Sequence, residues 1–95
     1  MSDAFHRDPV PSWPVIDLVV DDEEVVADPA GVGEPIRVAA YPDSAAAALS
    51  ASIAAAQRLQ ACRCRVRGTG ENGTTWWMVV DVSKGTLTDI AAEPI

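Results

Sequence analysis

The apolar positions in the first half of the chain fall into two short segments with the composition of β-strands. These are VIDLVV at 15–20 and IRVAAY at 36–41, both rich in β-branched residues. The acidic run at 21–24 is expected to end the first strand because adjacent like charges repel. The stretch at 28–35, which contains Pro and Gly, is predicted to be a loop.

An Ala-rich segment at 45–61 predicts a helix. Nearly every residue in it is a strong helix former, and Pro42, Asp43 and Ser44 supply a start signal. At about 100° per residue, one arc collects the residues predicted to be buried, which are Ala45, Ala46, Leu49, Ile53, Ala56 and Leu59. The opposite side, expected to face solvent, holds Ala47, Ala51, Ala54, Ala55 and Arg58. Its small side chains would let a second helix approach closely, although an exposed Ala-rich helix needs no partner.

The segment CRCRVR at 62–67 alternates strictly between apolar and basic residues, which predicts a strand with one buried face. TTWWMVVDV at 74–82 predicts the next strand, and the Gly-rich segment between them predicts a hairpin. A two-residue turn at Asn72 and Gly73 would mix charged and apolar side chains on both faces. A three-residue loop at 71–73, with Gly73 left-handed, keeps the two kinds of side chain apart, so we predict that loop.

The register set by this loop gives the hairpin two distinct faces. The core face pairs Cys62 with Val82, Cys64 with Val80 and Val66 with Met78, and places Trp76 over Gly68. The other face pairs Arg63 with Asp81, Arg65 with Val79 and Arg67 with Trp77.

These elements predict an α+β fold with one Ala-rich helix packed on a small mixed or antiparallel sheet of three to four strands, in the order β-β-α-β-β. The strands at 36–41 and 62–67 are expected to run parallel, as in a split βαβ unit. The segment after residue 85 fits a short strand or one helical turn. Residues 1–14, with three prolines, are predicted to be an extended or disordered tail before a single domain at 15–95.

The chain carries a formal net charge of −7, concentrated in its first half. A chain of this sign is repelled by phosphate backbones, so nucleic acid is disfavoured as a partner. No apolar run approaches the roughly 18 residues of a membrane span. The N-terminus lacks the features of a signal peptide, so we expect a cytoplasmic protein with reduced thiols.

The candidate catalytic and metal-binding groups are few. A structural zinc needs about four ligands, and besides Cys62 and Cys64 the only other soft donor is His6 in the tail. The two cysteines are therefore interpreted as small buried apolar residues. We expect no catalytic residue, no metal ligand and no cofactor.

Two surfaces remain as candidates for binding a partner. Arg63, Arg65 and Arg67 beside Trp77 suit three alternatives: ion pairs with the chain's own carboxylates, a protein partner or second copy, and single-stranded nucleic acid. The acidic run Asp21, Asp22, Glu23 and Glu24 is the nearest abundant supply of carboxylates for those arginines. It is otherwise a solvated linker or a docking patch for a basic surface.

The leading functional hypothesis is a small acidic interaction protein without enzymatic activity. It would be of bacterial or phage type and would act as an adaptor or inhibitor of a larger protein partner. A homodimer through the sheet or the helix is a further possibility. The alternative is a nucleic-acid-binding module that uses the arginines and Trp77.

Overall fold

The computed structural model describes residues 13–89, so the predicted N-terminal tail lies outside the described residues except for Trp13 and Pro14. The elements follow the order β-β-β-α-β-β-β. They are β1 (Val15–Val20), β2 (Glu24–Asp28), β3 (Ile36–Ala39), α1 (Ser44–Arg58), β4 (Arg63–Thr69), β5 (Thr75–Asp81) and β6 (Thr86–Asp89). Within residues 13–89, no helix is long and apolar enough to cross a membrane.

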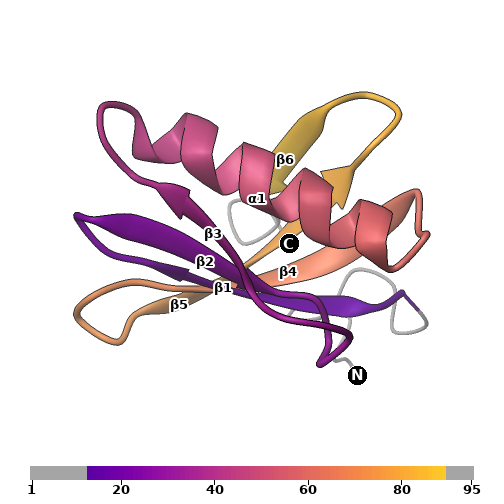
Figure 1. Ribbon diagram of the computed structural model, residues 1–95, viewed down its shortest axis with the longest axis horizontal. Coiled ribbons are helices and arrows are strands. Elements are labelled where there is room, and N and C mark those ends of the chain that lie inside the picture. The colour runs from indigo at the N-terminus through magenta and orange to yellow at the C-terminus, as the bar shows by residue number, and fades with distance from the viewer. Residues whose placement is uncertain (1–12, 90–95) are drawn as a thin grey trace, which may run out of the picture.

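All six strands form one mixed sheet in the order β3-β2-β1-β4-β5-β6, which curls around the helix as a half-barrel (Figure 1). The central strands β1 and β4 pair in parallel, and every other neighbouring pair is antiparallel. The sheet thus consists of two three-stranded meanders that start at the centre and proceed outward. The prediction of three to four strands in the order β-β-α-β-β is therefore wrong.

The error arose at β2 and β6. Strand β2 starts at the last residue of the acidic run, which was considered as a linker. Its side chains alternate, since Val25 and Ala27 are buried while Glu24 and Asp28 at its ends are only partly buried. The final segment forms strand β6, one of the two alternatives left open by its sequence.

The expected parallel relationship across the helix is confirmed. Strands β3 and β4 run in the same direction, and β2 and β1 lie between them. This arrangement is a split crossover, in which α1 carries the chain over two intervening strands.

The helix begins as predicted, since the Asp43 carboxylate accepts hydrogen bonds from the backbone N–H groups of Ala45 and Ala46, both at 3.1 Å. It ends at Arg58, earlier than predicted, and Gln60 adopts a left-handed conformation with φ 57°. Such a residue stops a helix after its last turn.

The predicted orientation of the helix is largely wrong. The buried residues of α1 are Ala47, Ala51, Ser52, Ala55 and Ala56, and Ala56 is the only one of them that was predicted to be buried. Ala45 and Ala46 are exposed, while Leu49 and Ile53 are only partly buried. The Ala-rich side is therefore packed against the sheet, where small side chains allow close contact, and the larger apolar residues lie at its flank. The side of α1 that was considered for a helix-mediated dimer therefore packs against the sheet of the same chain.

The hairpin register is confirmed at every predicted pair from Arg63 with Asp81 to Gly68 with Trp76. Gly73 is left-handed with φ 85°, and the Gly70 N–H donates to the Thr74 carbonyl at 2.9 Å to close the predicted three-residue loop. The cysteines differ from the prediction in one respect. Cys64 is fully buried, but Cys62 is exposed because it precedes β4.

Candidate interaction surfaces

One face of the sheet points away from α1, and we call it the outer face. Because side chains alternate along a strand, the strand registers define its members. They are Val15, Asp17 and Val19 of β1, Glu24, Val26 and Asp28 of β2, Arg37 and Ala39 of β3, Arg63, Arg65, Arg67 and Thr69 of β4, Thr75, Trp77, Val79 and Asp81 of β5, and Thr86 and Thr88 of β6. Within residues 13–89, no helix packs on this face.

Within residues 13–89, Arg63 and Arg67 form ion pairs across neighbouring strands. Arg63 Nε lies 3.1 Å from Asp81 Oδ2, and Arg67 Nη2 lies 2.8 Å from Asp17 Oδ1. Asp81 was the predicted neighbour of Arg63. Asp17 was not predicted, because no pattern along the chain indicates that β1 lies beside β4. Of the carboxylates considered as partners from the sequence, those at 21–24 are thus not the ones that pair with Arg63 and Arg67.

The arginines of β4 also hold the segment that leads into β1. The Nε of Arg65 donates to the Trp13 carbonyl at 2.8 Å, and the Arg65 backbone N–H donates to the Pro14 carbonyl at 2.9 Å. The Arg63 guanidinium lies 5.8 Å from the centre of the Trp13 ring, within the range of a cation–π contact. Arg63 and Arg65 thus help to fix the position of Trp13 and Pro14 in the same chain.

Apolar side chains lie between the charged and polar residues of the outer face. Val19 is 48% exposed, and Val15, Val26, Trp77 and Val79 are partly buried. Trp77 is paired with Arg67 in the ladder, as predicted. The outer face therefore combines accessible apolar area with arginine and an aromatic ring, residue types that are enriched at protein interfaces.

The charges of the outer face balance, in contrast to those of the chain. The face carries the basic residues Arg37, Arg63, Arg65 and Arg67 and the acidic residues Asp17, Glu24, Asp28 and Asp81. Counted over residues 13–89 the face is formally neutral, whereas the whole chain has a net charge of −7.

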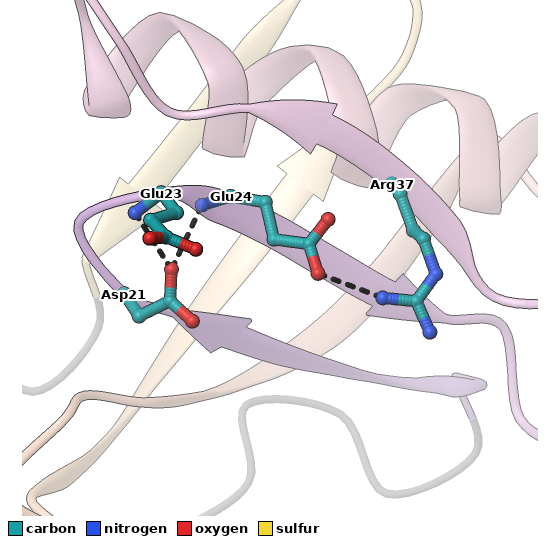
Figure 2. A network of polar contacts seen from close by, with 4 residues as sticks. All are labelled: Asp21, Glu23, Glu24 and Arg37. Atoms are coloured by element: carbon teal, nitrogen blue, oxygen red, sulfur yellow. Dashed lines mark hydrogen bonds and ion pairs between the residues drawn. The ribbon is translucent and has the colours of Figure 1, made fainter.

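The acidic run forms a turn whose carboxylates have different environments. Figure 2 shows the Asp21 carboxylate accepting hydrogen bonds from the backbone N–H groups of Glu23 and Glu24, both at 2.8 Å. These bonds, the Glu24 bond first, lower the pKa of Asp21. Glu24 Oε2 lies 2.7 Å from Arg37 Nη1 (Figure 2). Two of the four acids thus stabilise the β1–β2 turn and the β2–β3 pairing.

The other two acids, Asp22 and Glu23, are exposed at one end of the sheet. Strands β1, β3 and β4 all finish at this end, so the loops that carry Asp43 and Glu71 start here as well. The Asp22 backbone N–H donates to Glu71 Oε2 at 3.0 Å and links two of these loops. The structure thus brings acidic residues together that are far apart in the sequence.

Neither cysteine lies in a metal-binding constellation within the described residues, where no group of three or more His, Cys, Asp or Glu residues converges. Burial raises the pKa of the Cys64 thiol, which disfavours the thiolate. The described residues thus offer no activated cysteine at position 64.

Comparison of the chain with models of known protein families, with characterised proteins and with solved structures finds no match.

Proposed function

We propose that the chain is a small interaction protein without enzymatic activity, an adaptor or inhibitor acting in a cytoplasm, and that it binds a protein partner through its outer face. The observation that carries this proposal is the composition of that face. It combines the half-exposed Val19 and the partly buried Trp77 with charges that balance. Such a surface gains apolar burial on contact with another protein, and its balanced charges do not repel a partner as a net charge would.

A protein fits this surface better than a nucleic acid does. Binding to a phosphate backbone requires an excess of positive charge, and its strength grows with the number of phosphates neutralised. Arg63 and Arg67 already pair with Asp81 and Asp17, and the described residues of the face carry no net charge. The nucleic-acid alternative therefore lacks the electrostatic excess that it needs.

The acidic run at 21–24 has fewer carboxylates available for a partner than its sequence suggested. Asp21 and Glu24 have intramolecular partners in the turn and in the sheet. Asp22 and Glu23 remain exposed, and docking of a basic partner on them stays a prediction. The proposal accordingly relies on the outer face.

The test is affinity capture from a lysate of the source organism with tagged full-length chain. Val19→Lys places a charge in the outer face, and Ser50→Lys, at an exposed helix position on the other side of the molecule, adds the same charge as a matched control. We expect a protein, either heterologous or an untagged copy of the chain, to be retained by the wild type and by Ser50→Lys and lost with Val19→Lys. Equal retention by all three chains, or salt-sensitive retention of nucleic acid, would overturn the proposal.

A further inference from the structure

We infer that the partner that fits the outer face is a second copy of this chain, bound in a two-fold symmetric dimer with the two outer faces in contact. This inference rests on the proposed function, because it assigns a partner to the same surface.

The charge distribution leaves the outer face as the best place for two copies to meet. The other described surfaces carry more acidic than basic residues. The acidic residues are Asp21, Asp22, Glu23, Glu34, Asp43 and Glu71, and the basic residues are Arg58 and Lys84. Contacts between two copies through those surfaces bring like charges together, which is costly. The formally neutral outer face carries no such penalty and contains the accessible apolar area.

The strand order makes this face self-complementary. The strands β1 and β4 lie side by side at the centre of the sheet and run parallel. In the dimer, the two-fold axis lies between the two sheets, parallel to the strands and above the line where β1 meets β4. Rotation about this axis places β4 of each copy over β1 of the other. Arg67 is level with Asp17 in the β1–β4 register. Each Arg67 therefore lies over Asp17 of the second copy, and the two intramolecular ion pairs combine into a group of four alternating charges.

The same geometry brings the two copies of Val19 close to the axis, since β1 is next to it. Two sheets that pack face to face in this way keep their strands within about 30° of each other and bury the side chains between them. A lysine at position 19 would place two positive charges near the axis of the dimer, where they would repel each other.

The first measurement is sedimentation equilibrium of the full chain over a wide range of concentrations. We expect the wild type and Ser50→Lys to reach twice the chain mass and Val19→Lys to stay at the mass of one chain. Circular dichroism establishes that all three have the same fold. A wild type that stays monomeric up to about 200 μM, well above the micromolar range of specific complexes, would overturn the dimer.

A charge exchange tests the predicted geometry without an apolar substitution. Arg67→Asp alone places carboxylates against carboxylates across the axis, and Asp17→Arg alone places guanidinium groups against guanidinium groups. Each variant is expected to be monomeric by itself, whereas an equimolar mixture restores opposite charges at both contacts and is expected to give a heterodimer. A mixture that stays monomeric would overturn the two-fold arrangement.

The two proposals fail in different ways. A monomeric wild type whose heterologous protein partner is lost with Val19→Lys would overturn the dimer and keep the proposed function. A monomeric wild type with capture unaffected by Val19→Lys would overturn both.

Discussion

The indole ring of Trp76 lies against the backbone of Gly68, its partner in the β4–β5 ladder. A Cβ atom at position 68 would lie 2.6 Å from Trp76 Cζ2 and 2.8 Å from Trp76 Nε1, closer than side chains pack. A second contact also holds the ring in place, since Trp76 Nε1 donates a hydrogen bond to Sδ of Met78, two residues further along β5, at 3.1 Å. Glycine at position 68 is therefore required by a close contact, and its backbone conformation needs no left-handed φ.

Gly68→Ala is expected to lower the free energy of unfolding by about 1–3 kcal/mol, the usual cost of an overpacked site. Urea denaturation measures this loss. In a Trp76→Leu background the same substitution should cost less, because the ring that it strikes is gone. Equal costs in the two backgrounds would show that the contact is not what constrains position 68.

The buried Ala side of α1 gives a second prediction. Ala51 is fully buried, and Ala46 is exposed on the same helix. Ala51→Leu is expected to destabilise the protein by about 1–3 kcal/mol, because extra methylene groups have no space between helix and sheet. Ala46→Leu adds the same side chain in solvent and is expected to change stability by less than about 0.5 kcal/mol. The orientation predicted from the sequence requires the reverse order, so thermal unfolding of the two variants distinguishes the orientations.

The sequence was informative where side-chain types alternate sharply. In the β4–β5 hairpin, a shift of one residue would expose Cys64 and Val66 and bury arginines, so one register is strongly favoured. The helix lacked such contrast. With Ala on nearly every side, Leu49 and Ile53 dominated the calculated apolar arc, although the sheet selects the side that is uniformly small.

The candidate surface was predictable within the hairpin and not beyond it. The neighbours Asp81 and Trp77 follow from the register of one loop. The partners Asp17 and Trp13 depend on the parallel pairing of β1 with β4, two strands separated by more than 40 residues, which no local pattern specifies. Strand β2 was missed because the charges at its ends concealed the alternation of Val25 and Ala27.

A buried hydroxyl gives a third prediction. Ser52 is fully buried, and its Oγ has no hydrogen-bond partner among the described residues. Ser52→Ala is expected to raise the free energy of unfolding by about 1 kcal/mol or more, because the unsatisfied polar group is removed. The exposed Ser50 is the matched control, since Ser50→Ala changes only helix propensity, by about 0.5 kcal/mol. A gain for Ser52→Ala no larger than that for Ser50→Ala would contradict the prediction.

The two thiols are expected to react at very different rates. Cys62 is exposed, whereas Cys64 is buried and its thiol pKa is raised by burial. A thiol reagent such as 5,5′-dithiobis(2-nitrobenzoic acid) should therefore label one cysteine per native chain rapidly and both in denaturant. Cys62→Ser should abolish the rapid phase, and rapid labelling that persists in this variant would contradict the burial of Cys64.

The environment of Asp81 gives the last prediction, a dependence of stability on pH. Its Oδ1 accepts a hydrogen bond from Ser83 Oγ at 2.8 Å and one from the Lys84 backbone N–H at 3.2 Å, and its Oδ2 lies 3.1 Å from Arg63 Nε. The Ser83 bond, followed by the Lys84 bond and the charge of Arg63, holds the pKa of Asp81 below its ordinary value.

Because the pKa of Asp81 is lower in the folded chain than in the unfolded chain, the unfolded state binds more protons between the two values. The stabilisation by Asp81 is therefore fully present above the ordinary aspartate pKa of about 3.9 and is lost as the pH falls through the folded value. Asp21, whose pKa is also lowered, contributes in the same direction.

Urea denaturation at a series of pH values from about 6 to about 2, below the ordinary aspartate pKa, measures this dependence. Asp81→Asn is expected to give a shallower fall in stability with decreasing pH than the wild type. Ser83→Ala, which removes the strongest of the bonds that lower the pKa, should give an intermediate slope while keeping the carboxylate. If Asp81→Asn kept the full wild-type slope, the acid sensitivity would have to come from other carboxylates.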